Sequence, residues 1–117
     1  MTIEELRIRI DALDRQLVEL LSERARAAQR IGQLKAATSL PVYEPNREKV
    51  IYANVRAANK GPLPDIELTH IYERIIDVMR SLQRNELASE RNAQAAQSAG
   101  EPGQDASEEP PETGKKS

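Results

Sequence analysis

One apolar seam runs along the first third of the chain and limits what the chain can fold into. Its positions recur at alternating steps of four and three, and they are Leu6, Ile10, Leu13, Leu17, Leu20, Ala27, Ile31 and Leu34, with the charged Arg24 in the same register between Leu20 and Ala27. A repeat of 3.5 residues is typical of a helix that packs along its whole length. No proline precedes Pro41, which disfavours helix at Leu40. The pattern predicts one helix from about Ile3 to about Ala36, started by a capping box of Thr2 and Glu5.

Two further segments also predict helices. Pro45 suits a first helical turn, and Gly61 with Pro62 predicts a stop in which Gly61 is the left-handed cap. The third helix is expected to begin near Asp65, as its N-cap, and to fray after Leu87. Its apolar face consists of Leu68, Ile71, Tyr72, Ile75, Ile76, Met79 and Leu82. Because no segment alternates with the period of a strand, we expect an all-α fold with one long, one short and one medium helix.

The composition changes near residue 91. Residues 92–117 contain no Leu, Ile, Val, Met or aromatic residue and hold three of the seven prolines. Such a segment buries too little apolar surface to offset the entropy of ordering it. We therefore predict a helical domain over residues 1–90 and a disordered acidic tail, rich in Pro, Gly and Ser, over residues 91–117.

The residue content excludes several classes of function. The chain has no cysteine and one histidine, His70, which we expect to be solvated. This excludes disulfide frameworks, cysteine nucleophiles, Ser-His-Asp triads and histidine-rich metal sites, so no metal or cofactor is expected. A net charge of −2 argues against nucleic-acid and anionic-membrane partners. No stretch is apolar enough to span a bilayer or to form a signal peptide, so the expected location is cytoplasmic.

The length of the first helix indicates assembly. A helix of some 33 residues is roughly 50 Å long, whereas a compact body of about 90 residues is only about 30 Å across. The part of the apolar seam that extends beyond the body needs cover, which a second copy of the chain would supply. We therefore expect an intertwined homodimeric helical bundle.

Polar residues occupy positions where a plain bundle would have leucine. They are Arg24, Lys35, Glu44, Arg47, Glu48 and Gln83. Lys35 follows Arg24 by eleven residues and so points within about 20° of its direction, whereas Arg7 points about 100° away. Each of them alone has a plain structural reading, as a snorkelling side chain, a helix-end charge, a surface charge or a register-setting polar group. Together they place more cations than acids in one interior, which favours a small anionic ligand, best a dicarboxylate.

Three segments carry a resemblance to a known family: LRIRIDALDRQLVELLSERARAAQRIGQLK, PVYEPNREKVI and NKGPL. Over about residues 3–86 the chain resembles the all-helical (AroQ-class) chorismate mutases, most closely the mutase domain of bifunctional mutase–prephenate dehydratase proteins. The resemblance implies three helices per chain, an entwined dimer with two active sites, and rearrangement of chorismate to prephenate in phenylalanine and tyrosine biosynthesis. This reaction needs positioning and charge stabilisation, with no covalent intermediate and no cofactor.

The resemblance also implies roles for individual residues. Arg24 and the partner chain's Arg7 correspond to the two guanidiniums that clamp the substrate carboxylates, a task that suits Arg better than Lys. Lys35 and Gln83 correspond to the donors to the ether oxygen, and Glu48 to the carboxylate that holds the ring hydroxyl. Lys35, Gln83, Arg24 and Glu48 are the expected catalytic residues.

Three more positions complete the expected substrate-binding set. Glu44 assists Glu48 at a position where relatives often have Asp, and Arg47 corresponds to a further active-site arginine. Met79 departs from the family pattern, because well-known members have there a serine that helps to hold a carboxylate.

Two other functions remain open from the sequence. An isochorismate–pyruvate lyase has the same fold and a similar cationic site, although the NKGPL segment favours the mutase. A non-enzymatic dimerisation module would use the polar seam only to set its pairing register. Because the chain ends soon after the mutase-like region and has no cysteine, we also expect no dehydratase or regulatory domain, no feedback inhibition by phenylalanine, and no leader of the secreted mutases.

Overall fold

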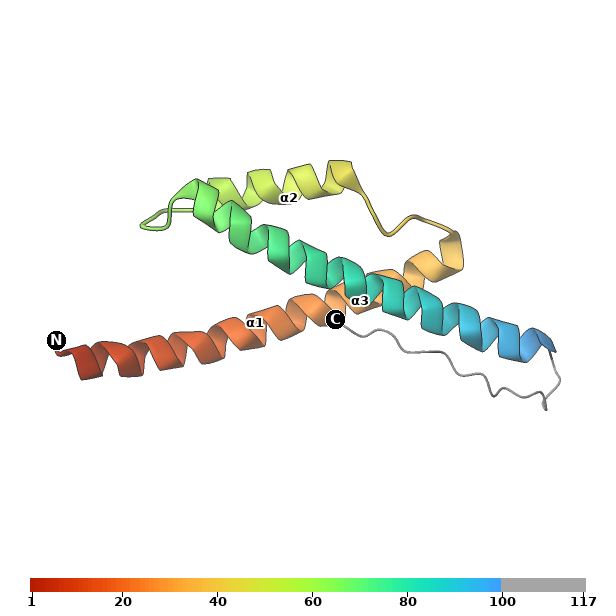
Figure 1. The fold of residues 1–117 in the computed structure, drawn as a ribbon, viewed down its shortest axis with the longest axis horizontal. Coiled ribbons are helices and arrows are strands. Elements are labelled where there is room, and N and C mark those ends of the chain that lie inside the picture. The colour runs from red at the N-terminus through yellow and green to blue at the C-terminus, as the bar shows by residue number, and fades with distance from the viewer. Residues whose placement is uncertain (100–117) are drawn as a thin grey trace.

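The computed structural model describes residues 1–99, which form three helices: α1 (Ile3–Thr38), α2 (Pro45–Ala58) and α3 (Asp65–Ala99) (Figure 1). No strand occurs in this part of the chain. The expectation of an all-α fold with three helices per chain is confirmed.

The long first helix has the ends that the sequence predicts. The Thr2 hydroxyl accepts a hydrogen bond from the Glu5 amide at 3.0 Å, and the Glu5 carboxylate accepts one from the Thr2 amide at 2.7 Å. This capping box satisfies two amide groups at the start of the helix. At the other end Ser39 adopts the left-handed conformation, with φ of 65°, and its amide donates to the Lys35 carbonyl at 2.9 Å. The predicted span of α1 is confirmed to within two residues.

The end of α2 differs from the expectation. Its C-cap is Asn59, whereas Gly61, the predicted cap, lies in the following loop with φ of 77°. The reason is the Asn59 side chain, which donates to the Leu63 carbonyl at 2.8 Å and to Asp65 Oδ1 at 2.7 Å. Its own oxygen accepts from the Gly61 amide. Asp65 is therefore the first residue of α3 and anchors the loop through its carboxylate, rather than standing before the helix as its cap.

The third helix is longer than predicted. It has 35 residues, nearly as many as the 36 of α1, and it continues past the expected end at Leu87 as far as Ala99. Residues 88–99 contain five Ala, two Gln, one Glu and one Arg, and no Gly or Pro. Such residues favour helix without needing apolar burial, so α3 continues through residues 91–99, the first part of the segment predicted to be a disordered tail. Residues 100–117 of the predicted tail lie outside the described residues, and the domain boundary at residue 90 remains a prediction.

The two other helices both pack on α3. Where α1 crosses α3, a Cβ added at Gly32 would lie 2.9 Å from the Gln83 Cα and 3.0 Å from the Gln83 carbonyl oxygen. Only glycine therefore lets the two backbones approach so closely. The residues buried most fully around this crossing are Ala28, Gly32, Lys35, Ile76 and Met79. The crossing brings the end of α1 beside the middle of α3, and α2 lies along the first half of α3 (Figure 1).

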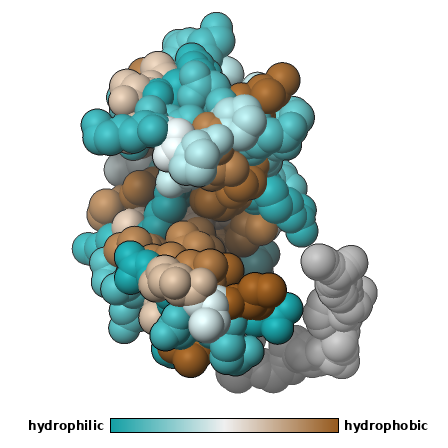
Figure 2. Space-filling model, turned by 90° about the vertical axis from the view of Figure 1, so that its left-hand side faces the viewer, coloured by the Kyte–Doolittle hydropathy of each residue, from teal (hydrophilic) through white to brown (hydrophobic). Residues whose placement is uncertain are grey.

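The N-terminal half of α1 stands apart from the other two helices (Figure 1). Its seam is exposed within the single chain, as Ile10 at 54% and Leu17 at 56% illustrate. Between this half and α3 lies an apolar hollow of about 660 Å³, and apolar side chains gather around it in Figure 2. Within residues 1–99, none of the helices is long and apolar enough to cross a membrane.

Candidate active site

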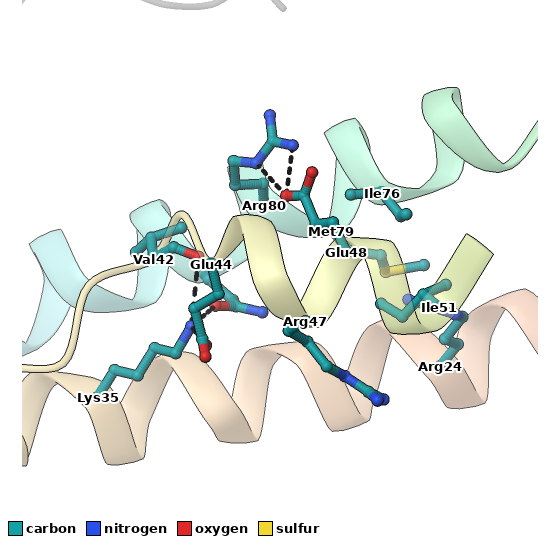
Figure 3. A pocket seen from close by; sticks show the side chains of 11 residues that line it. Arg24, Lys35, Val42, Glu44, Arg47, Glu48, Ile51, Ile76, Met79 and Arg80 are labelled. Atoms are coloured by element: carbon teal, nitrogen blue, oxygen red, sulfur yellow. Dashed lines mark hydrogen bonds and ion pairs between the residues drawn. The ribbon is translucent and has the colours of Figure 1, made fainter. Parts of the chain in front are cut away.

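A polar cavity lies where the C-terminal part of α1, the start of α2 and the middle of α3 face one another (Figure 3). Its main part has a volume of about 430 Å³, within the range of small-molecule sites. A smaller pocket of about 70 Å³ adjoins it. The smaller pocket is lined by Arg24, Lys35, Val42, Glu44, Arg47, Glu48, Ile51, Ile76, Met79, Arg80 and Gln83.

Lys35 is the most deeply buried charge of the cavity, with 4% of the residue exposed. It lies one helical turn after Gly32, so the close helix crossing places it beside α3. Its ammonium forms an ion pair with Glu44 Oε2 at 2.5 Å and donates to Gln83 Oε1 at 2.9 Å and to the Val42 carbonyl at 3.3 Å. Three acceptors, two from the loop between α1 and α2 and one from α3, fix the Nζ position. Since Gln83 uses its oxygen for Lys35, its amide hydrogens remain available to a ligand.

A second ion pair links α2 to α3. Arg80 donates to Glu48 Oε2 from Nη2 at 2.6 Å and from Nε at 3.2 Å. Both side chains are half-buried, with 21% and 18% exposed. The hydrogen bond to Glu48 is the largest effect on the pKa of Arg80 and raises it above its ordinary value, against the opposing effect of burial.

Two arginines of the cavity have no acidic partner among residues 1–99. Within the described part of the chain, neither Arg24 nor Arg47 forms an ion pair. The Arg24 guanidinium lies 5.9 Å from the centre of the Tyr72 ring, which holds it without neutralising it. The cavity thus has four cations, Arg24, Lys35, Arg47 and Arg80, against two carboxylates, Glu44 and Glu48. This excess of two positive charges matches a ligand that carries two negative charges.

The structure brings together seven of the eight residues that the sequence singled out, all except Arg7. Arg7 is exposed on the free half of α1 and precedes Arg24 by 17 residues, or about 25 Å along the helix axis. It does not line the cavity of its own chain. Met79 lies at the cavity wall, where only 6% of it is exposed, next to Ile76 and Ile51.

Sequence reasoning missed three residues that support the site: Arg80, Tyr72 as the neighbour of the Arg24 guanidinium, and Val42 through its backbone carbonyl. Arg80 was open to prediction, because it follows Ile76 by four residues and precedes Gln83 by three, which places it on the same face of α3. Val42 had no such signal, since it acts through its backbone in a loop. No group of three or more potential metal ligands occurs within residues 1–99.

Comparison with known proteins agrees with this geometry. The sequence model of the family described as chorismate mutase type II matches residues 6–84. The chain belongs to this family. It is 40% identical over 86 residues to the bifunctional chorismate mutase/prephenate dehydratase of Aquifex aeolicus, an alignment that covers 70% of this chain and 24% of that protein. The chain therefore spans about a quarter of the length of such bifunctional relatives.

Relatives of similar length to this chain also exist within the family. The chorismate mutase of Methanocaldococcus jannaschii is 29% identical over 91 residues, which are 77% of this chain and 92% of that protein. The structure of the Thermus thermophilus chorismate mutase (form II) superposes with a TM-score of 0.69 at 36% identity, over 70% of this chain and 93% of that one. The Helicobacter pylori chorismate mutase, solved in complex with prephenate, gives a TM-score of 0.67 at 34% identity, over 74% and 93% of the two chains.

Proposed function

We propose that this protein is a chorismate mutase that converts chorismate to prephenate, a step towards phenylalanine and tyrosine. The observation that carries the proposal is the excess of two cations in the cavity, in a chain of the type II chorismate mutase family. Chorismate is a dicarboxylate, and Arg24 and Arg47 are the cavity cations without an acid partner in the described residues. The prephenate complex of the Helicobacter pylori relative, at 34% identity, supports the same product here.

The residues present suit a reaction that requires no nucleophile. The enzyme holds a compact conformer of chorismate and stabilises the negative charge that develops on the breaking ether oxygen. Lys35 and Gln83, whose side chains are 2.9 Å apart, supply an ammonium and an amide donor for that oxygen. Because Lys35 is already held by Val42 and Glu44, and Gln83 by Lys35, little reorganisation is needed when charge develops.

The remaining residues bind the rest of the substrate. Glu48 accepts a hydrogen bond from the ring hydroxyl, with Glu44 assisting, and Arg24 and Arg47 bind carboxylate oxygens. Met79 offers an apolar surface against the ring, because a thioether cannot donate the hydrogen bond that a serine would.

A second copy of the chain completes the site. The free half of α1 carries Leu6, Ile10, Leu13 and Leu17, and residues 1–99 of one chain leave each of them about half exposed. Two copies that pack these seams together into an intertwined homodimer would bury the seams and let Arg7 of the partner reach a substrate carboxylate beside Arg24. Light scattering at micromolar concentration would give twice the mass of the chain, and a monomer would contradict this part of the proposal. The cytoplasmic location expected from the sequence remains a prediction.

The decisive test is an assay of the purified protein with chorismate. Loss of chorismate absorbance is followed, and the products are separated as prephenate or pyruvate. Prephenate formation that falls by about two orders of magnitude or more in Arg24→Ala, with the dimer preserved, is the expected result. No consumption of chorismate at micromolar enzyme would overturn the proposal. Release of pyruvate from isochorismate, without prephenate from chorismate, would assign the lyase reaction instead.

A further inference from the structure

Arg80 is the one charged side chain of the cavity that neither the seam pattern nor the family resemblance singled out. We propose that Arg80 is a positioning residue, which holds the Glu48 carboxylate in place as the acceptor for the substrate's ring hydroxyl. The inference rests on the proposed function of Glu48.

The first argument is how the contact divides the Glu48 carboxylate. The Arg80 Nε and Nη2 groups both donate to Oε2, at 3.2 and 2.6 Å. The lone pairs of Oε1 remain for a ligand donor. A free carboxylate rotates and presents either oxygen in many directions. In Glu48, the two donors of the planar Arg80 guanidinium hold Oε2, which fixes the direction of Oε1.

The second argument is how firmly Arg80 itself is held. Three groups from three segments contact its guanidinium: Glu48 at the start of α2, Tyr43 in the preceding loop and Asp77 on α3. The guanidinium carbon lies 5.3 Å from the centre of the Tyr43 ring, and Nη1 lies 3.5 Å from Asp77 Oδ1. The side chain is also only 21% exposed. A guanidinium fixed on several sides transmits its position to the carboxylate that it binds.

The third argument is that Arg80 has little left to offer a substrate directly. Its Nε and Nη2 face Glu48, and its Nη1 faces Asp77. Arg24 and Arg47, in contrast, have no ion-pair partner within residues 1–99. Arg80 therefore acts through Glu48, while the unpaired arginines are the ones available to substrate carboxylates.

A double-mutant cycle with Arg80→Gln and Glu48→Gln tests this inference. Chorismate turnover is measured for the full chain and each variant, well below the unfolding temperature and with the dimer checked by light scattering. We expect Arg80→Gln to reduce kcat/KM about 10-fold, mostly through KM, since hydroxyl binding is shared by ground and transition states. In a protein that already carries Glu48→Gln, adding Arg80→Gln should lower kcat/KM less than about 2-fold, because the carboxylate that Arg80 positions is already gone. Arg80→Lys keeps the charge but loses the two-donor geometry, and should fall between wild type and Arg80→Gln.

Arg84→Gln is the matched control, because Arg84 lies one turn further along α3 and is exposed. Arg84→Gln should leave kcat and KM for chorismate unchanged. An Arg80→Gln loss of equal size in both backgrounds would mean that Arg80 contacts the substrate itself, and would overturn the inference. A lower unfolding temperature with unchanged kcat and KM would mean that the pair only ties α2 to α3, and would also overturn it.

The same cycle measured on prephenate binding by calorimetry separates this inference from the proposed function. If the wild-type chain fails to convert chorismate, the mutase proposal falls, and prephenate affinities of the four proteins still decide the role of Arg80. Non-additive losses of affinity support the positioning role. Additive losses, or no binding of prephenate by any of the four, overturn it.

Discussion

The Lys35 ammonium donates to the Gln83 side-chain oxygen across the α1–α3 crossing, with Nζ and Oε1 2.9 Å apart. The two side chains expected to stabilise the ether oxygen are therefore joined before any substrate arrives. Lys35 is also bound to Glu44 and Val42, so it keeps partners when Gln83 is removed. This makes Gln83 the cleaner of the two positions at which to remove a donor.

We expect Gln83→Ala to lower kcat by about 100- to 1,000-fold, the usual cost of one donor to a developing oxyanion. The dimer and the unfolding temperature should change little by comparison. Gln33→Ala is the control, because Gln33 also links α1 to α3, through Glu86 at 3.2 Å, but does not line the cavity. Equal kcat values for Gln83→Ala and Gln33→Ala in the chorismate assay would remove Gln83 from the catalytic set.

Gly32→Ala should destabilise the protein, although alanine favours helix over glycine by about 1 kcal/mol. The new Cβ would meet backbone atoms of Gln83 at 2.9 and 3.0 Å, and backbone cannot move aside as a flexible side chain does. The helices must separate, at a typical overpacking cost of about 1–3 kcal/mol. Because Lys35 and Gln83 lie on opposite sides of this crossing, kcat should fall as well.

Urea unfolding and the chorismate assay check the Gly32→Ala prediction together. A variant that unfolds at higher urea than wild type, with full activity, would contradict the close packing at the crossing. A loss of stability with unchanged kcat would mean that the Lys35–Gln83 contact tolerates the shift.

Tyr52 gives the protein a stability change at high pH. Burial, and then the nearby carboxylates of Glu73 and Glu48, raise the pKa of the Tyr52 phenol above its ordinary value of 10.0, while Arg80 lowers it. The folded state thus favours the neutral phenol. Its contribution to stability is fully present below pH 10.0 and is lost as pH rises from there through the higher pKa of the folded state.

The measurement compares wild type with Tyr52→Phe by urea unfolding at about pH 8 and at several values above about pH 10, the ordinary pKa of a tyrosine phenol. We expect the free energy of unfolding of wild type to fall relative to that of Tyr52→Phe only in the upper range. A difference between the two proteins that stays constant across the series would show that the phenol titrates alike in the folded and unfolded chains.

The sequence predicts the local structure of this chain well because local signals determine it. The Thr2–Glu5 capping box, the unbroken seam of α1 and Pro45 at the start of α2 each act within one or two helical turns. The polar residues at helix-interface positions also predict the cavity, since a charge in a helix interface requires a partner or a ligand. Three of these residues, Arg24, Lys35 and Gln83, line the same cavity.

The remaining features depend on contacts that one-dimensional patterns do not record. The end of α2 is set by the Asn59 side chain, which reaches across a loop to Asp65, and not by the expected glycine. The extension of α3 to Ala99 follows from helix propensity, because residues 88–99 have no apolar face from which a helix could be predicted. The contacts of Arg80 depend on Glu48 and Tyr43, which the fold brings to it from α2 and the preceding loop. The place proposed for Arg7 in the site depends on a second chain.

Replacing Met79 by serine should have two opposing effects, a loss of stability and a gain in substrate binding. It is 6% exposed and lies against Ile76 at the cavity wall, where the family resemblance implies a serine that binds a substrate carboxylate. Met79→Ser removes buried methylene groups and sulfur, at a cost of about 2–4 kcal/mol of stability. It also adds a hydroxyl donor, and a hydrogen bond worth about 1 kcal/mol lowers KM about fivefold.

Met79→Ala separates the two effects, because it leaves a similar space without the hydroxyl. We expect both variants to unfold at lower urea than wild type, and only Met79→Ser to lower KM for chorismate, with kcat little changed in either. The comparison rests on KM values measured below the unfolding range of both variants. If Met79→Ser binds chorismate no better than Met79→Ala, the hydroxyl at this position does not reach the carboxylate, and the methionine serves here as a packed wall of the cavity.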